Sequence, residues 1–182
     1  MFCRYYSKSI PRLSETFAVS TLLAAEMSHF DERSGIVSVE TPWGKWWQTI
    51  SEIYIEVNVK EGTRGKDVNV EFKPSTLRVD VCGETVIKGD LFSIIKPDDS
   101  IWTIEDKKMI RICLCKGREV AANLWKSLLK NQYEANILEQ DNMQKKLTLQ
   151  RYQLENPGFD FSSADISGNY QEGGPQLPSY ND

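Results

Sequence analysis

Two nearby cysteines, a single histidine and a pair of adjacent carboxylates are the side chains of this sequence whose types suit catalysis or metal binding. Cys113 and Cys115 lie two residues apart on an alternating segment, so they share a face with Cα atoms roughly 6.8 Å apart. That separation is near the upper limit for a disulfide, and two thiols without a nearby histidine make a poor zinc site. We interpret both as small apolar strand residues, with redox sensing as the alternative.

The remaining candidates do not form a reaction centre. His29 lies in a polar stretch and has no evident orienting group, which a catalytic base requires. Glu105 and Asp106 point to opposite faces if they lie on a strand, and Asp106 is better suited to shaping a turn. The segment 62–66 contains Gly-Lys without the spacing of a phosphate-binding loop. We predict a protein that is not an enzyme and that uses no cofactor or metal.

Short alternating segments form the scaffold that carries these residues. From 51 to 60, apolar residues alternate with polar ones, which is typical of a half-buried strand. Similar segments follow at 68–72, 77–81, 85–91, 102–104 and 110–114, with turns predicted between them, one of them at 97–100. This spacing predicts an all-β antiparallel sandwich or barrel. Trp102 and Ile104 share the apolar face of their segment, so we predict that they lie in the core.

Two C-terminal helices are predicted after the last strand. In 119–130, Leu124 with Leu128 and Trp125 with Leu129 lie four residues apart, as on one face of a helix. Trp125 is expected to pack this helix onto the sandwich. Residues 137–155 form a second, more polar helix, whose apolar stripe is too short for a free-standing coiled coil.

Four regions follow from this pattern: an extension at 1–26, the sandwich at 27–118, the C-terminal helices at 119–155 and a flexible acidic tail at 156–182. The tail has four acidic residues and no Lys or Arg, so it carries the whole net charge of −4. Residues 1–155 therefore have no net charge, which argues against nucleic acid as a partner, because such binding needs an excess of basic residues. The sequence has no apolar run long enough to span a bilayer and too few cysteines for a disulfide scaffold. We therefore expect a cytoplasmic protein without a membrane partner.

The extension 1–26 is basic and serine-rich, and three interpretations compete. A secretory signal fits poorly because polar residues interrupt its apolar stretch. A mitochondrial presequence is the minor alternative for the address of the protein. We favour a disordered or targeting-like extension upstream of the domain, and both Met1 and Met27 stay open as the start of the functional protein.

Aromatic residues are the main candidates for contact with a partner. Trp46 and Trp47 are neighbours and face opposite ways on an extended chain, so at least one should be exposed or cover a sheet edge. Tryptophan is enriched at binding hot spots, so partner contact and edge covering both remain open for these two and for Trp43. Phe159 and Phe161 are unusual in an acidic tail, and we expect them to dock on their own domain or on a partner.

Lys107 and Lys108 lie in a predicted exposed turn, where they could meet an acidic partner. The alternative is solvated charge, which we favour because exposed ion pairs contribute little free energy.

Five motifs, taken in order, resemble the NudC family over about residues 27–170. They are Trp46-x-Gln48-Thr49, Gly89-x-Leu91, Trp102-x-Ile104-Glu105-Asp106, Trp125, and Pro157-x-Phe159-Asp160-Phe161-Ser162. Thr41-Pro42-Trp43-Gly44 and Ile166-Ser167-Gly168-Asn169-Tyr170 point to one branch of that family. The strand order and turns resemble the CS domain, a sandwich related to the α-crystallin fold.

The resemblance implies a co-chaperone that cooperates with the 90-kDa heat-shock chaperone. Its implied clients are β-propeller (WD-repeat) proteins, including the lissencephaly protein of the dynein pathway. The implied locations are the cytoplasm, the centrosome and the spindle. The alternative is a structural scaffold for dynein and microtubule regulators without client-folding activity.

Overall fold

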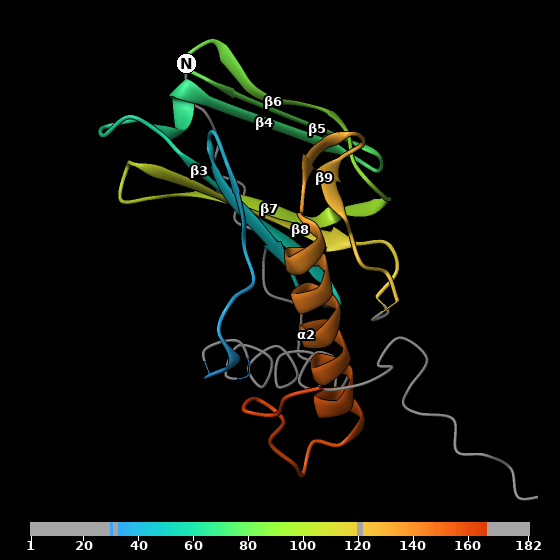
Figure 1. Cartoon of the computed structure of the whole chain (residues 1–182). Helices are drawn as coiled ribbons and strands as arrows, with labels where there is room; N and C mark the ends of the chain where they lie inside the picture. Colours follow the sequence, from blue (N-terminus) through green and yellow to red (C-terminus); the bar gives the residue numbers. More distant parts are fainter. Residues whose placement is uncertain (1–29, 31–32, 120–121, 167–182) are drawn as a thin grey trace, which may run out of the picture.

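The computed structural model describes residue 30, residues 33–119 and residues 122–166, and within them two antiparallel sheets pack face to face (Figure 1). The first sheet has the order β1-β2-β3-β8-β7 and the second has the order β4-β5-β6. The first sheet consists of β1 (Val39–Thr41), β2 (Gly44–Gln48), β3 (Glu52–Asn58), β8 (Met109–Lys116) and β7 (Ile95–Glu105). The second consists of β4 (Val68–Lys73), β5 (Thr76–Val81) and β6 (Glu84–Asp90), and the 3-10 turn η1 (Gly65–Asp67) precedes it. The predicted antiparallel sandwich is confirmed.

The core lies between the sheets, where the predicted alternation places the apolar residues. Ile53, Ile55 and Val57 of β3 are fully buried, and residues 110, 112 and 114 of β8 are buried beside them. From the second sheet, Leu77, Val79 and Ile87 close the core. The period of two therefore predicted these inward faces correctly, because each sheet buries one face.

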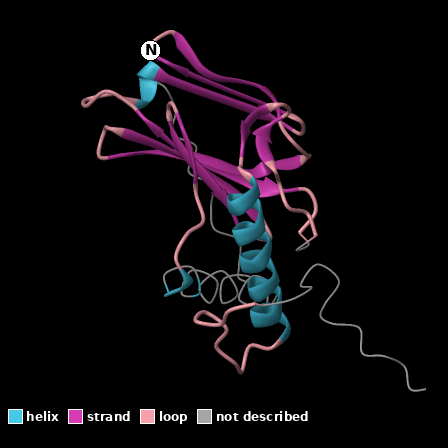
Figure 2. Ribbon diagram, in the orientation of Figure 1, coloured by secondary structure: helices cyan, strands magenta, loops and turns pink. Residues whose placement is uncertain are grey.

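A hairpin replaces the first predicted C-terminal helix. Residues 119–130 form no helix in their described part; instead β9 (Ser127–Leu129) pairs with β10 (Gln132–Glu134). Figure 2 draws this hairpin in magenta, as strands. Leu129 forms a β-bridge with Leu91 at the end of β6, and the Phe92 N–H donates to the Leu128 carbonyl at 3.1 Å. The helix prediction was wrong because this segment forms strand β9. On a strand, the consecutive side chains of Leu128 and Leu129 point to opposite sides, and both side chains are buried. Pairing with β6 overrides the helix propensity of leucine. Trp125 is fully buried, as predicted.

The second predicted helix is present as α2 (Ile137–Glu155) and extends away from the sandwich (Figure 1). Asn136 caps it: its side chain accepts from the Glu139 N–H at 2.9 Å, and the Glu139 carboxylate accepts from the Asn136 N–H at 2.7 Å. Met143 and Leu147 are its buried apolar pair. In the part of the chain that the structure describes, no helix is long and apolar enough to cross a bilayer.

Strand β7 departs from the prediction at two points. The expected turn at 97–100 is an irregularity inside the strand, where the register against β8 shifts between Lys96 and Ile101. Ser100 stabilises it, because its hydroxyl donates to the Lys96 carbonyl and accepts from the Cys115 N–H. Trp102 and Ile104 face the core but are only partly buried, since β7 is the last strand of its sheet.

The predicted extension at 1–26 and the end of the predicted tail, 167–182, lie outside the described residues. The first part of the tail, 156–166, is described and is folded against the rest of the chain, as shown below.

Candidate partner-binding surface

The three clustered tryptophans are buried within their own chain. Trp46 has no exposed surface, and its indole N–H donates to the Tyr133 carbonyl at 3.1 Å. Trp43 is 8% exposed and meets the Tyr133 ring edge-on at 5.2 Å between centroids. Trp47, also 8% exposed, points to the outer face and stacks on Tyr54 at 5.2 Å. None of the three is therefore exposed as predicted for a partner contact, because Tyr133 and Tyr54 cover these rings. The edge-covering alternative does not describe Trp46 and Trp47 either, since their strand β2 pairs with β1 on one side and with β3 on the other.

A glycine places this tryptophan strand. Gly44 begins β2 with φ of +150°, and a Cβ at this position would lie 2.0 Å from the Glu56 carbonyl oxygen. Only glycine lets the backbone of β2 approach β3 this closely. Without that approach, Trp46 and Trp47 would not reach their registered partners, Ile55 and Tyr54.

The polar pair that follows the tryptophans, Gln48-Thr49, joins the sandwich to its C-terminal elements. The Gln48 amide donates to the Trp125 carbonyl at 2.8 Å, and its oxygen accepts from the Trp125 N–H at 2.9 Å. The same amide contacts Met143 Sδ on α2 at 3.2 Å. Gln48 is 4% exposed, so these bonds form away from water. We call the group formed by Gln48, Trp125 and Lys116 the Gln48 clasp.

Lys116 is the charged member of the Gln48 clasp and has no exposed surface. Its ammonium donates to Gln48 Oε1 at 2.9 Å, to the Thr49 carbonyl at 2.8 Å and to the Asn123 carbonyl at 3.1 Å. Burial disfavours the charged form and lowers the pKa of Lys116 to about 7. The sequence contained a signal for this position: Lys116 continues the inward series 110, 112 and 114 of β8. The clasp is structural, since it is sealed from any ligand.

Charged side chains form a row on the outer face of the first sheet. Glu56 accepts from Arg111 at 2.7 Å and lies 3.3 Å from the Lys45 ammonium. Arg111 also pairs with Glu105 at 2.9 Å. The Glu105 carboxylate is bound in this row by Arg111, whereas Asp106 lies in the following turn with φ of +49°. The two carboxylates thus have separate environments, and Asp106 lies in a turn, as predicted.

The predicted turn lysines lie at an exposed end of the sandwich. Asp106 and Lys107 both have positive φ, +49° and +56°, which matches the hairpin turn whose twist suits paired strands. The Lys107 and Lys108 carbonyls accept from the N–H groups of Gly62 and Val59 at 3.0 and 2.9 Å. The loop between β3 and β4 is therefore bonded to this turn. We call residues 59–67 and 106–108 together the basic end.

The basic end gathers five basic and three acidic residues from two distant parts of the sequence. Arg64 pairs with Asp67 at 3.2 Å, and Lys108 lies 4.0 Å from Asp106. The other three basic residues are exposed and form no ion pair within the described ranges, although the hydrogen bond from Arg64, and then the charge of one of the three, Lys66, lowers the pKa of Asp67. They are Lys60, Lys66 and Lys107. The sequence identified Lys107 and Lys108 but missed the other loop, which only the fold brings beside them.

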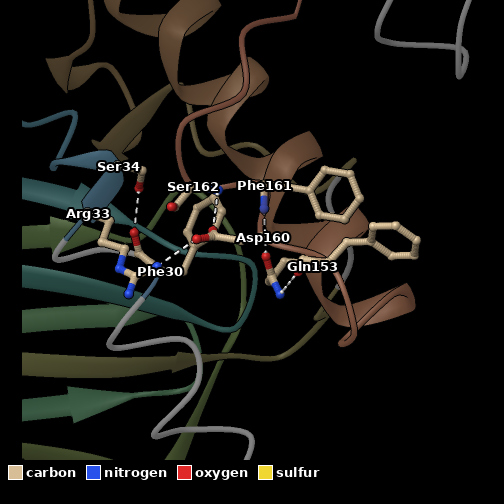
Figure 3. A network of polar contacts seen from close by, with 8 residues as sticks. Phe30, Arg33, Ser34, Gln153, Asp160, Phe161 and Ser162 are labelled. Carbon is tan, nitrogen blue, oxygen red and sulfur yellow. Dashed lines mark hydrogen bonds and ion pairs between the residues drawn. The ribbon is translucent and has the colours of Figure 1, made fainter.

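The aromatic segment at the start of the tail docks on α2, which fits one of the two predicted possibilities (Figure 3). The Phe161 ring lies 6.1 Å from Tyr152, and its N–H donates to the Gln153 side chain at 3.0 Å. Gln153 in turn donates to the Phe159 carbonyl at 2.7 Å. Phe161 is half-buried, whereas the Phe159 side chain is 69% exposed and remains available to a partner.

An ion pair fixes the same segment to the residues before β1. Arg33 donates to Asp160 at 2.6 Å, and the Ser162 N–H donates to the other oxygen of that carboxylate at 3.0 Å (Figure 3). Bonding to Ser162, and then Arg33, holds the pKa of Asp160 below its usual range. Buried Phe30 lies beside this pair in a hollow that Arg33, Gln153 and Phe159 also line. The motif around Phe159 thus connects both ends of the described chain.

The predicted cysteine pair, Cys113 and Cys115, lies on strand β8, as expected. Both are free thiols, as is Cys82 in the exposed turn after β5. Burial, and then the nearby Glu52 carboxylate, raises the pKa of Cys113 and of Cys115. Since the thiolate is the reactive form, this environment disfavours nucleophilic and redox chemistry at both. Among the described residues, no three His, Cys, Asp or Glu side chains are grouped as metal ligands. His29 lies outside those residues.

Comparison with known proteins gives a consistent result. The CS domain matches residues 42–116. Human NudC domain-containing protein 2 is 51% identical over 148 residues, which cover 81% of this chain and 94% of that protein. The nuclear migration protein nudC of Drosophila melanogaster is 27% identical over 106 residues, 57% of this chain and 31% of that protein. The crystal structure of mouse NudC domain-containing protein 2 is 49% identical over 71% of this chain and 98% of that chain, with a TM-score of 0.41.

Proposed function

Because the chain belongs to the NudC family of CS-domain proteins, we propose that it is a non-catalytic co-chaperone that binds other proteins through exposed surfaces of its sandwich. In this proposal it cooperates with the 90-kDa heat-shock chaperone. It stabilises β-propeller (WD-repeat) clients, including the lissencephaly protein of the dynein pathway, in the cytoplasm and at the centrosome and spindle.

The observation that supports the proposal most strongly is the 51% identity that extends over nearly the whole length of NudC domain-containing protein 2. The motifs shared with the family also have physical roles here. Gln48 and Trp125 hold the hairpin and α2 on the sandwich, while the segment around Phe161 docks on α2. These contacts support a rigid module that presents surfaces to partners.

The chemistry of the described residues supports a binding role over an enzymatic one. The thiols of Cys113 and Cys115 are held in their unreactive form, and the carboxylates of Glu56 and Glu105 are bound in ion pairs. An enzymatic role would need a reactive group that these residues do not offer. Activity that survives replacement of every cysteine and of His29 would contradict this part of the proposal.

The test combines pull-down with a folding assay. The full chain is used to recover partners from cell extract, and recovery of the 90-kDa chaperone together with WD-repeat proteins is expected. The purified chain is then added to a thermally stressed β-propeller protein, and aggregation is followed by light scattering. Reduced aggregation supports the co-chaperone. Stoichiometric binding to one folded partner without protection supports the scaffold alternative, and recovery of neither class contradicts the proposal.

A pair of surface variants locates the contact. The buried tryptophans are unsuitable, because truncating a buried Trp costs about 3–5 kcal/mol and would unfold the module. Phe159→Ala removes a ring that is 69% exposed, and Ile36→Ala, at 50% exposed, is the matched control. Loss of partners with Phe159→Ala alone places a contact on the tail segment. Equal recovery by both variants excludes that segment as the contact.

A further inference from the structure

Strand β7 presents a free backbone edge over its second half. It is the last strand of the first sheet, and among the described residues no strand pairs with its outer side. Its first half is unsuited to pairing, because Pro97 lacks an N–H and the register shift at Lys96–Ile101 interrupts the strand. From Ile101 to Glu105 the strand has no proline, lysine or register shift. Prolines, lysines and bulges protect the free edges of sheets from pairing with other chains, and residues 101–105 contain none of these features.

The side chains of this segment are incompletely covered. Trp102 and Ile104 face the core but remain partly exposed, whereas Ile110 and Ile112, which pair with them on β8, have no exposed surface. On the outer face, Ile101 is 61% exposed. An additional strand beside β7 would cover all three apolar side chains and bond the free backbone groups. The edge therefore suits an extended chain more than a folded surface.

The charge beside this edge identifies the chemistry of the occupant. The basic end begins directly after Glu105, and its unpaired lysines come from both loops. The two loops lie together at one end of the sandwich, the left end in Figure 1. The lysines are Lys60, Lys66 and Lys107. A segment that runs along β7 would end among these ammonium groups, where acidic side chains are favoured.

We propose that residues 101–105 of β7 pair with an extended segment of a partner protein, and that the basic end binds acidic residues at the end of that segment. The inference rests on the proposed function only in that the module binds other proteins. It adds the surface, the mode of recognition and the character of the peptide. A second copy of this chain is the competing occupant, since free edges also pair with one another.

The test uses two synthetic peptides of about ten residues, a length typical of strands. One carries three glutamates before alternating threonine and valine, so that its acidic end lies at the basic end when it pairs antiparallel. The other has the reverse order, as parallel pairing requires. A third peptide repeats the better binder with alternate backbone amides methylated, which removes ladder hydrogen bonds and keeps charge and side chains. Binding to the full chain is measured by fluorescence anisotropy and by amide chemical shifts.

The charge variants are matched in number and type. The test variant reverses the three unpaired lysines of the basic end, and the control reverses three exposed lysines on β6 and at the β9–β10 hairpin. The test set is Lys60→Glu, Lys66→Glu and Lys107→Glu. The control set is Lys88→Glu, Lys126→Glu and Lys130→Glu.

The proposal predicts shifts and slowed exchange for amides of residues 101–105. Methylation and the test variant should each weaken binding about tenfold or more, as expected when several hydrogen bonds or ion pairs are lost. The control variant should change binding by less than about twofold. Failure of both acidic peptides to bind, binding without β7 shifts, or equal binding of the methylated peptide overturns the proposal. Dimerisation through residues 101–105 in sedimentation experiments without peptide overturns it in favour of a second copy. Chaperone recovery in pull-down is read separately, so failure here leaves the proposed function standing.

Discussion

Replacing Gln48 with leucine should destabilise the whole module, because the side chain closes the Gln48 clasp. Gln48→Leu keeps the volume but leaves three buried polar groups without this partner: the Trp125 N–H, the Trp125 carbonyl and the Lys116 ammonium. Two neutral hydrogen bonds and one to a charged donor sum to about 4 kcal/mol at usual values. Single domains are commonly stable by only about 5–15 kcal/mol.

The assay is urea unfolding at pH 7, followed by tryptophan fluorescence, with hydrogen exchange at the Trp125 amide as a local measurement. We expect a loss of about 4 kcal/mol in the free energy of unfolding and faster exchange of that amide. Gln132→Leu is the control, since Gln132 is exposed on β10 and surface changes usually stay within about 0.5 kcal/mol. A loss below about 1.5 kcal/mol, or unchanged exchange at Trp125, would refute the reasoning, since the buried groups would then have other partners.

Three further predictions follow from single contacts. Burial lowers the pKa of Lys116 to about 7 in the folded chain. Between pH 7 and the usual lysine pKa of 10.5, this side chain therefore binds more protons in the unfolded chain than in the folded one. The stability of the wild type relative to Lys116→Met should therefore rise by up to about 2 kcal/mol from pH 7 to pH 9, measured by urea unfolding. Gly44→Ala should cost about 3 kcal/mol or more, because its Cβ would meet the Glu56 carbonyl; thermal unfolding measures this. Phe161→Ala should release the docked tail segment from Tyr152, which faster hydrogen exchange at residues 159–162 would report.

Each of these has its own control. If the difference in free energy of unfolding between the wild type and Lys116→Met does not change with pH, the ammonium stays fully charged. Its three hydrogen-bond acceptors would then outweigh the cost of burying the charge. Gly62→Ala is the control for Gly44, since Gly62 also has positive φ but a Cβ there meets nothing within 4 Å. Equal losses would assign the cost to backbone conformation alone. Phe159→Ala is the control for Phe161, and similar exchange in both variants would show that the Phe161 ring does not hold the segment.

The sequence was sufficient for features that depend on local pattern. Period-two alternation predicted the inward faces of β3, β5 and β8, because a side chain on a strand can only point to one of two sides. Residues 137–155 were predicted as a helix, and the structure has α2 there. Family motifs were recognisable from residue identities alone. They include Gln48 and Phe161, but the motifs alone do not show that Gln48 bonds to Trp125 or that Phe161 packs on Tyr152.

Features that depend on contacts between distant segments were decided by the tertiary structure. The segment around Leu128 has helical spacing, yet hydrogen bonds to the end of β6 make it a strand. Trp46 and Trp47 face opposite ways as predicted, but Tyr133 and Tyr54 cover them, and no local rule reveals that cover. Likewise, Lys60 and Lys107 are far apart in the sequence, and only backbone bonds between their loops bring them to one end of the sandwich. Local sequence fixes where a side chain can point, whereas burial and charge clusters depend on which other segment fills the space it points into.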